Sequence, residues 1–304
     1  MTITDVPGVE VGHFTDDEAL TGVTVITFPE PNIATAEVRG AAPGTREIAL
    51  LQPGSRIENI QAIVLSGGSA FGLATADGVS RGLLADGKGH RTINDIIVPI
   101  VPTAILFDLM IGDAEAWPGP EEGAMAYDSA NSGPVEMGNV GAGTGATVAG
   151  WRGMGAVRKG GLGSHSIRAG DAIVGAVVAV NAVGDVFTLE GESLTGGSPE
   201  PPINPNPPSQ AELSNTTLVT VATNAKLSRT DLMRLTVRAH DAIGACVRPG
   251  HTRYDGDVAF AVSCGDVEAD PDAVGEAAFI SVARAIEWGV RSAESAGGVP
   301  AMDG

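Results

Sequence analysis

The sequence predicts a layered α/β protein in which a buried sheet packs against helices. Residues 172–180 are all apolar or glycine, a pattern typical of a central strand that is covered on both faces. Residues 62–66 form a second strand-like run, which leads through a glycine turn into a helical pattern over 73–84. After residue 216, strand and helix patterns alternate in the order β-α-β-α, which favours a sheet covered by helices.

The first hundred residues predict more strands and one candidate ligand-binding turn. The strands are expected at 9–14, 22–28 and 96–100. The turn Gly67-Gly68-Ser69 lies directly before the helical pattern, and backbone N–H groups at a helix N-terminus commonly bind ligand atoms. Ser69 itself is a poor hydrolase nucleophile, because the second glycine of a Gly-x-Ser-x-Gly elbow is absent.

A proline-rich segment at 195–210 divides the chain. It holds six prolines and has no periodicity, so we expect an exposed linker rather than a strand or helix. Past the linker, Ser228 and Asp231 form a pattern similar to a capping box, which predicts the start of a helix. The elements expected after the linker are strands at 217–223 and 258–263 and helices at 230–246 and 273–293.

Composition and charge exclude several classes of function. The chain has 304 residues, enough for a large core, and a net charge of −19 with no basic cluster. This charge argues against nucleic-acid or anionic-membrane partners. We find no apolar window of membrane-spanning length and no signal-peptide pattern at the N-terminus, so we expect a soluble cytoplasmic protein. Cys246 and Cys264 lack metal-ligand spacing and are expected to be buried apolar residues.

Thr216 is a candidate nucleophile. It stands at the head of a predicted strand just after the linker. A Thr that becomes the first residue of a chain can attack carbonyls, since its own α-amine serves as the base. The hydroxyl of Thr216 would first attack the carbonyl of Asn215, and water would open the resulting ester. Two other interpretations stay open: residues 215–217 are also a glycosylation sequon, and threonine is common at strand starts.

Asp255-Gly256-Asp257 is a candidate proton relay. Two close carboxylates do not both ionise readily, so one keeps a proton and can donate it while the other accepts. Such a pair could orient and activate the hydroxyl and amine of Thr216. The alternative is a simple turn, for which Asp and Gly are favoured residues.

The glycine-rich segments 141–147 and 159–163 do not match a nucleotide-binding fingerprint. We expect them to form a glycine-lined wall that lets a ligand approach the backbone, with Gly143 and Lys159 in contact with it. The histidines show no pairing at metal-ligand spacing, and each is expected to be a surface or turn residue. They are His13, His90, His165, His240 and His251.

Taken together, these segments resemble one family, the DmpA/BapA-like aminopeptidases of peptidase family S58. The family includes β-aminopeptidases and endo-type 6-aminohexanoate (nylon) oligomer hydrolases. The similar segments keep their order along nearly the whole chain: 6–13 (VPGVEVGH), 40–47 (GAAPGTRE), 65–73 (LSGGSAFGL), 98–102 (VPIVP), 140–146 (VGAGTGA), 159–163 (KGGLG), 215–217 (NTT) and 255–257 (DGD).

The resemblance implies a single αββα sandwich of the N-terminal-nucleophile-hydrolase type. It also implies self-cleavage into an α chain of residues 1–215 and a β chain of residues 216–304, assembly into a tetramer, and no metal or organic cofactor. Thr216 would be the nucleophile, and Asp255 with Asp257 would form the relay. Asn181 would stabilise the oxyanion, whereas by itself it would be interpreted as a turn residue at the end of a strand.

Two departures from the family pattern concern the substrate range. An active-site Tyr of the family aligns with Trp117, which offers only an N–H donor. A Lys of the nylon-hydrolase branch is replaced near Gly150-Trp151, and Lys159 is the nearest lysine. The expected substrate contacts are therefore Trp117, Ser69, Gly143 and Lys159.

The predicted function is amide hydrolysis through an acyl-enzyme on Thr216, with short peptides, β- or ω-amino-acid amides or 6-aminohexanoate oligomers as substrates. One alternative is an acyltransferase of the ornithine acetyltransferase type, although its Ala-Thr-Met-Leu cleavage sequence is replaced here by residues 215–218 (NTTL). The other alternative is a catalytically silent relative that only binds a ligand.

Overall fold

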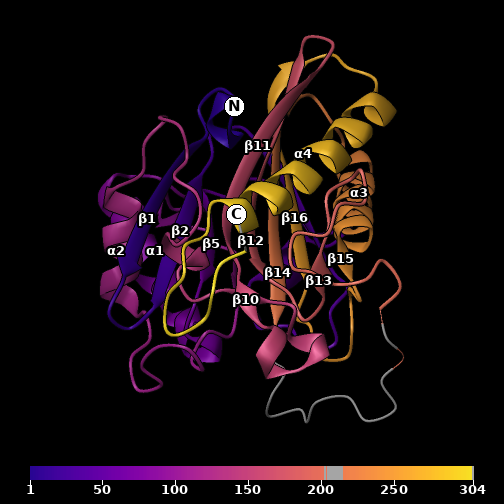
Figure 1. Ribbon diagram of the computed structural model, residues 1–304. Helices are drawn as coiled ribbons and strands as arrows, with labels where there is room; N and C mark the ends of the chain where they lie inside the picture. The colour runs from indigo at the N-terminus through magenta and orange to yellow at the C-terminus, as the bar shows by residue number, and fades with distance from the viewer. Residues whose placement is uncertain (202, 204–214, 303–304) are drawn as a thin grey trace.

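Two five-stranded sheets lie face to face, and helices cover the outer face of each sheet (Figure 1). The computed structural model describes residues 1–201, 203 and 215–302. The first sheet has the order β1 (Glu10–Asp16), β2 (Thr21–Thr27), β5 (Ala62–Ser66), β8 (Thr103–Ile105) and β4 (Thr45–Arg46). The second has the order β11 (Gly161–Ala169), β12 (Ala172–Asn181), β14 (Thr216–Ala225), β16 (Val258–Val267) and β3 (Ile33–Val38).

Three apolar cores separate the four layers. α1 (Thr75–Ala85) and α2 (Pro120–Asp128) pack on the first sheet through residues such as Val79 and Tyr127. α3 (Arg229–Cys246) and α4 (Pro271–Arg291) pack on the second sheet. The third core lies between the sheets, where Leu65 of β5 and Phe260 of β16 belong to one cluster. The molecule is therefore an αββα sandwich, as the family resemblance implied.

The shorter elements lie in the connections between these layers. They are β6 (His90–Arg91), β7 (Ile97–Val98), β9 (Thr147–Val148), β10 (Arg158–Lys159), β13 (Asp185–Val186), β15 (Val247–Arg248) and the 3-10 helices Ile3–Asp5, Ile48–Leu51, Ser69–Ala74, Gly141–Gly143, Gly150–Arg152 and Met154–Ala156.

Most predicted elements are confirmed to within a few residues, and the strand expected at 96–100 is wrong. Only Ile97–Val98 is extended there, and it pairs with β6 in a small hairpin rather than in a main sheet. The chain joins the first sheet later, at β8. Pro99 and Pro102 explain the difference, because each proline lacks the N–H that a sheet ladder needs.

The sequence patterns did not predict β3, β4, β8, β11 or α2. The first three residues of β11, 161–163, were interpreted as part of a glycine wall, but Gly163 is needed where α4 crosses the strand. A Cβ atom on Gly163 would overlap the carbonyl oxygen of Ala285 in α4. The glycines that allow this close packing are the same residues that weaken the strand pattern.

Half of the proline-rich segment at 195–210, residues 202 and 204–210, lies outside the described residues. Its first residue, Thr195, is buried and its hydroxyl donates to Asp185, 2.7 Å away. Arg152 donates to Asp185 and to the carbonyl of Thr195, so the point where the linker begins is fixed to β13, which pairs with β15. Within the described residues, no helix combines the length and apolar character that crossing a membrane requires.

The pairing of the second sheet brings the predicted site residues together at one end. β12 and β14 are antiparallel, and their register places Asn181 opposite Thr216. β14 and β16 are parallel, so the segment that precedes β16, with Asp255 and Asp257, lies beside the head of β14. An isolated parallel bridge between Asn215 and Asp255 continues the same register three residues before Leu218 and Val258, the first pair of these two strands.

Candidate active site

Thr216 and the peptide bond that precedes it form the centre of the site. Thr216 is the first residue of β14 and is only 4% exposed. Its Oγ1 donates a hydrogen bond to the carbonyl oxygen of Asn215 at 2.6 Å. The backbone N–H of Gly256 donates to the same oxygen at 3.0 Å. The carbonyl is thus polarised by two donors, and the hydroxyl oxygen lies next to the bond that it would attack.

Gly256 occupies its position because no side chain fits there. A Cβ atom at this residue would lie 2.7 Å from Thr216 Oγ1 and 2.7 Å from the carbonyl oxygen of Ala42. Both distances are below any normal contact, so another residue would push the turn away from the Asn215–Thr216 bond. The glycine between the two aspartates therefore has a steric role in the site as well as a role in the turn.

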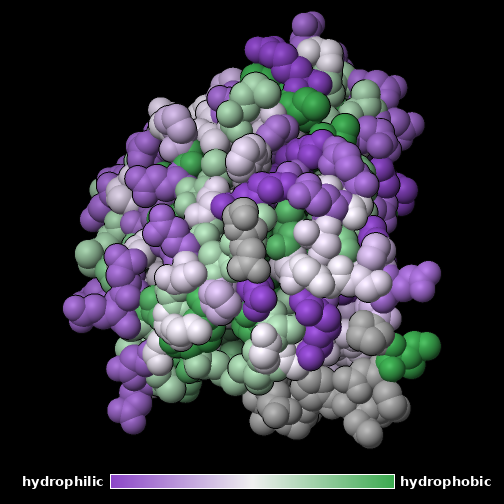
Figure 2. All heavy atoms as spheres, in the orientation of Figure 1, coloured by the Kyte–Doolittle hydropathy of each residue, from purple (hydrophilic) through white to green (hydrophobic). Residues whose placement is uncertain are grey.

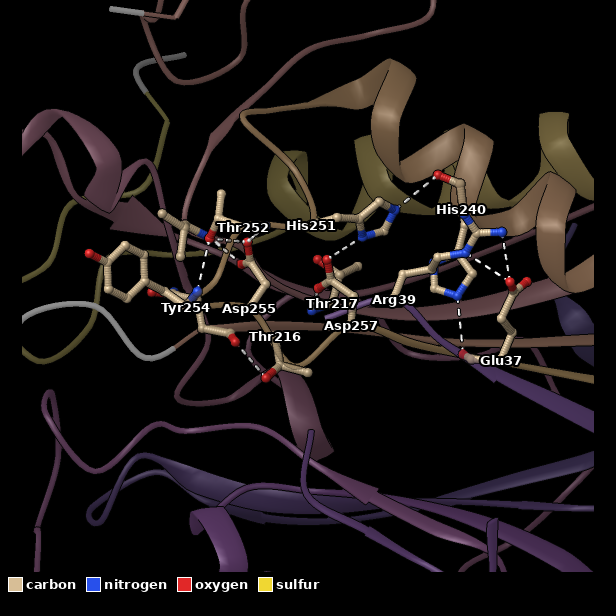
Figure 3. A network of polar contacts seen from close by, with 12 residues as sticks. Glu37, Arg39, Thr216, Thr217, His240, His251, Thr252, Tyr254, Asp255 and Asp257 are labelled. Carbon is tan, nitrogen blue, oxygen red and sulfur yellow. Dashed lines mark hydrogen bonds and ion pairs between the residues drawn. The ribbon is translucent and has the colours of Figure 1, made fainter. Parts of the chain in front are cut away.

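Asp257 holds the strand that carries Thr216. Its Oδ1 accepts a hydrogen bond of 2.7 Å from the backbone N–H of Thr217, the next residue of β14. Its Oδ2 lies 2.7 Å from Nδ1 of His251 (Figure 3). Both carboxylate oxygens are therefore bonded, and the side chain is buried.

Asp255 is bonded to its own loop. Its Oδ2 accepts from the backbone N–H and the hydroxyl of Thr252, at 2.7 and 2.6 Å. Its Oδ1 accepts from the backbone N–H of Val183 at 3.3 Å, just after β12. The described hydrogen bonds of the two aspartates thus anchor the turn and β14, and neither carboxylate bonds the Thr216 hydroxyl in the intact chain.

Burial and the neighbouring Asp257 raise the pKa of Asp255 to about 6. The hydroxyl and N–H of Thr252 act in the opposite direction, because they stabilise the ionised form. The Asp255 carboxyl therefore exchanges its proton closer to neutral pH than an ordinary aspartate does. A raised pKa of this kind is what a proton relay would use, and the relay itself stays a prediction.

Asn181, which was predicted to stabilise the oxyanion, is paired with Thr216 in the strand register. It is fully buried, and its Oδ1 accepts from the backbone N–H of Thr147 at 2.8 Å. Its Nδ2 donates to the carbonyl oxygen of Phe107 at 3.1 Å. These bonds fix the orientation of the amide, and a primary amide has a second N–H to offer.

Lys159 is buried and organises the glycine-rich segment. Its Nζ donates to the carbonyl oxygens of Thr144 and Ala146 at 2.8 and 2.7 Å. Burial lowers the pKa of Lys159 to about 7, against the opposing effect of the Asp108 charge. The two bonded carbonyls belong to the segment that leads into Thr147, and the Thr147 N–H bonds the Asn181 side chain. Lys159 therefore fixes the segment that holds Asn181.

A pocket of about 360 Å³ lies against the Asn215–Thr216 junction. Its walls are mostly apolar, and Asp108 is the charged residue among the described lining residues. The pocket is lined by Phe107, Asp108, Met110, Ile111, Gly145, Thr147, Gly150, Met154, Gly155, Val157, Asn215, Gly298, Val299 and Pro300. Figure 2 shows a mostly hydrophilic face on which apolar and intermediate residues gather in the lower centre, where Figure 1 draws β10 and the C-terminal segment.

None of the four expected substrate contacts belongs to the described lining of this pocket. Trp117 is 42% exposed and stacks on Phe71 with the ring centroids 4.2 Å apart. Gly143 is buried under β11, where a Cβ atom would overlap the backbone nitrogen of Leu162. Ser69 has a positive φ of 54°, and its N–H donates to the carbonyl oxygen of Leu106. Their roles toward substrate stay predictions.

The sequence analysis missed His251 as a site residue. The expectation that all five histidines are surface or turn residues is wrong for His240, which is buried in α3. His251 does lie in a turn, but it is half-buried and bonded to Asp257. Its position in the same short loop as both aspartates was the available signal. Within the described ranges, no group of three His, Cys, Asp or Glu side chains could hold a metal ion.

Known proteins are similar to this chain along nearly its whole length. The family described as peptidase family S58 matches residues 1–302. An uncharacterized aminopeptidase of Mycobacterium leprae is 38% identical over 100% of this chain and 93% of its own length. A 6-aminohexanoate-oligomer endohydrolase of Paenarthrobacter ureafaciens is 29% identical over 87% of this chain and 75% of its own.

Two solved structures share the fold. The L-aminopeptidase D-Ala-esterase/amidase of Ochrobactrum anthropi, a variant of the Ntn hydrolase fold, superposes with a TM-score of 0.76 at 24% identity, covering 99% of this chain and 91% of its own. A Burkholderia sp. β-aminopeptidase gives a TM-score of 0.75 at 22% identity, covering 99% and 90%. The match along the whole sequence and the shared αββα fold lead to one assignment: this chain belongs to peptidase family S58, a family of aminopeptidase-type hydrolases.

Proposed function

We propose that the chain is a self-cleaving amide hydrolase whose nucleophile is Thr216. The observation that carries the proposal is the contact of 2.6 Å between Thr216 Oγ1 and the carbonyl oxygen of Asn215, which also accepts the Gly256 N–H. An N→O acyl shift needs a hydroxyl beside its own preceding carbonyl and a donor for the negative charge that develops on that oxygen. Both are present in the intact chain.

Self-cleavage would proceed in two balanced steps. Thr216 Oγ attacks the carbonyl carbon of Asn215, the C–N bond breaks, and the hydroxyl proton passes to the departing nitrogen, which becomes the α-amine of Thr216. Water then attacks the ester; its OH stays on Asn215 as a carboxyl group and its hydrogen returns to Thr216 Oγ. The products are an α chain of residues 1–215 and a β chain of residues 216–304.

In turnover the free α-amine of Thr216 would take the proton from its own hydroxyl. The hydroxyl attacks a substrate amide, the amine product leaves with that proton, and water releases the acyl group. Asn181 would stabilise the oxyanion through its second amide N–H. Asp255 and Asp257 would tune the α-amine by sharing one proton close to it.

The substrate class follows from the pocket and from the relatives. The apolar walls suit a methylene chain or an apolar side chain beside the scissile amide. We therefore propose short peptides, β- or ω-amino-acid amides or 6-aminohexanoate oligomers as substrates, bound in this pocket beside Asn215. Assembly of the cleaved units into a tetramer, a cytoplasmic location and the lack of a cofactor remain predictions.

The test is the intact mass of the purified protein under denaturing conditions. Wild type should give fragments of about 22 and 9 kDa, in proportion to the two parts of a 304-residue chain of 30.7 kDa. Thr216→Ala should stay whole, and Thr216→Ser should still cleave because it keeps the hydroxyl. A wild-type chain that stays whole would contradict the proposal and favour a relative that only binds a ligand.

The cleaved enzyme should then be assayed on aminoacyl p-nitroanilides, including β-homo and 6-aminohexanoyl forms. Release of free acid identifies a hydrolase, whereas transfer of the acyl group to an added amine identifies an acyltransferase. Cleaved protein with no turnover on the whole panel would leave self-processing intact and contradict the hydrolase assignment.

A further inference from the structure

His251 lies between the acidic pair and helix α3. It follows β15 in the loop that leads to Asp255 and Asp257, and its backbone has a positive φ of 54°. A residue other than glycine rarely adopts this backbone conformation, so the surrounding contacts must hold His251 in it. Its Nδ1 lies 2.7 Å from Asp257 Oδ2 and its Nε2 lies 3.4 Å from the carbonyl oxygen of His240 (Figure 3).

Both neighbours of the His251 ring are acceptors. An ionised carboxylate and a backbone carbonyl have no proton to donate, so each ring nitrogen faces a group that requires an N–H. The doubly protonated imidazolium satisfies both contacts, whereas either neutral tautomer satisfies only one. Burial lowers the pKa of His251, but the hydrogen bond and charge of Asp257 outweigh this effect, so the pKa is raised above its usual value.

The other charged groups nearby do not replace this interaction. His240 packs its ring edge-on against His251 with the centroids 4.9 Å apart, and burial lowers the pKa of His240 to about 4, so it is neutral. Its Nε2 bonds the carbonyl oxygen of Glu37 at 3.1 Å. The Glu37 carboxylate is paired with Arg39 at 2.6 Å. The charges that act on His251 from close by are therefore those of Asp257 and Asp255.

We propose that His251 is a positioning residue that holds the Asp257 carboxylate against the Thr217 N–H and thereby places the proton of the acidic pair on Asp255. This inference rests on the proposed function, because it assigns the proton order of the relay beside Thr216. Asp257 must stay a carboxylate with one oxygen free to accept from Thr217. The Thr217 bond fixes the head of β14, and with it the direction in which the Thr216 hydroxyl points.

Removing the His251 charge should shift the titration of the acidic pair. A neighbouring opposite charge lowers the pKa of a carboxylate by about 1 to 3 units. The His251 side chain is 24% exposed, so solvent weakens the effect and about 1 unit is expected. Without the imidazolium, the negative charge of the acidic pair loses its neighbouring positive charge, and the acid limb of the pH–rate profile should move to higher pH.

The main experiment is the pH profile of kcat/KM for amide turnover by the cleaved enzyme. His251→Asn keeps an amide N–H near the position of Nδ1, loses the charge and tolerates a positive φ. It should retain a measurable plateau rate with the acid limb about 1 pH unit higher. His251→Ala should show the same shift with a lower plateau. The control His165→Asn changes a partly buried histidine on β11 and should leave the profile unchanged.

Two results would overturn the inference. One is an acid limb that stays in place in His251→Asn while the rate falls at every pH, because a merely structural role predicts that pattern. The other comes from NMR titration of labelled histidines in the uncut Thr216→Ala chain. His251 should titrate above pH 6.5 there, and its pKa should fall when Asp257→Asn is added; an unchanged pKa contradicts the ion pair.

The NMR titration also separates the two proposals, since it needs no activity. A wild-type enzyme that neither cleaves nor turns over, but shows the expected titration of His251, would contradict the proposed function and leave the ion pair standing. An active enzyme whose acid limb stays in place in His251→Asn, and whose His251 pKa stays unchanged when Asp257→Asn is added, would contradict the role of His251 alone.

Discussion

Asn181 and Thr216 face each other across the antiparallel pair of β12 and β14, one at the last residue of its strand and the other at the first residue of its own. This pairing places an amide donor beside the candidate nucleophile without any loop to position it. Both strands are inner strands of the second sheet, so the relative position of Asn181 and Thr216 is more rigid than one set by loops. The turn Asp255-Gly256-Asp257 precedes β16, and the parallel pairing of β14 with β16 brings this turn beside Thr216.

Asn181→Asp should reduce turnover far more than self-cleavage. The substituted side chain keeps an acceptor for the Thr147 N–H but loses the amide donor. Loss of one oxyanion donor costs about 10²- to 10³-fold in kcat. In the intact chain the Asn215 carbonyl is bonded by Thr216 and Gly256 instead, so cleavage should continue. Turnover is measured on the p-nitroanilides and cleavage by intact mass.

A matched control for Asn181→Asp is available in the same sheet. Asn224 of β14 also uses its Oδ1 to accept a backbone N–H, from Ile173 at 2.7 Å, at the other end of the strand. Asn224→Asp should turn over substrate at nearly the wild-type rate. Equal losses in the two variants would show that Asn181 acts through the stability of the sheet rather than on the reaction.

Gly256→Ala should slow self-cleavage by at least about 10-fold, because the added methyl would lie 2.7 Å from Thr216 Oγ1. The turn must move, and the Gly256 N–H then moves away from the Asn215 carbonyl oxygen. Cleavage is followed by the time course of intact mass after cell-free synthesis.

Gly244→Ala provides the comparison for that variant. Gly244 lies inside α3, and a Cβ atom there meets no heavy atom within 4 Å. Alanine is favoured over glycine in a helix interior by about 1 kcal/mol, so this variant should cleave like wild type and be slightly more stable. Normal cleavage of Gly256→Ala would show that the turn is more plastic than its contacts imply.

The part of the site built on strands could be predicted from the sequence. The apolar run that ends at Asn181 and the strand that starts at Thr216 have clear patterns, because both are covered on two faces. The family resemblance supplied their roles. The alternation of strands and helices also indicated a layered fold, and the capping pair Ser228 and Asp231 is confirmed at the start of α3.

The parts that escaped prediction depend on contacts between distant segments. The glycines of β11 are explained by α4, which packs directly on that strand, and for Gly161 also by the backbone of Gly138. His251 has no distinctive spacing, and its role depends on a loop that turns Nδ1 toward Asp257 and on α3 behind it. The pocket likewise joins residues near 110, 150 and 300, which no local pattern connects.

Lys159→Met should change how stability depends on pH. Burial lowers the pKa of Lys159 to about 7 in the folded chain, whereas an unfolded lysine titrates near its model value of 10.5. Between these values the unfolded chain binds one more proton than the folded chain. The contribution of Lys159 to the unfolding free energy should therefore rise with pH from about 7 to about 10.5, by up to about 1.4 kcal/mol per pH unit.

The methionine variant lacks this proton, so its stability relative to the lysine form should be greatest near pH 7 and should decline as pH rises. Urea unfolding of the uncut Thr216→Ala chain, with and without Lys159→Met, measures the difference at each pH. Lys226→Met is the control, because the Lys226 side chain is 67% exposed and should give no such slope. Parallel curves for the Lys159 pair would mean that Lys159 stays charged when folded, with the carbonyls of Thr144 and Ala146 offsetting the cost of its burial.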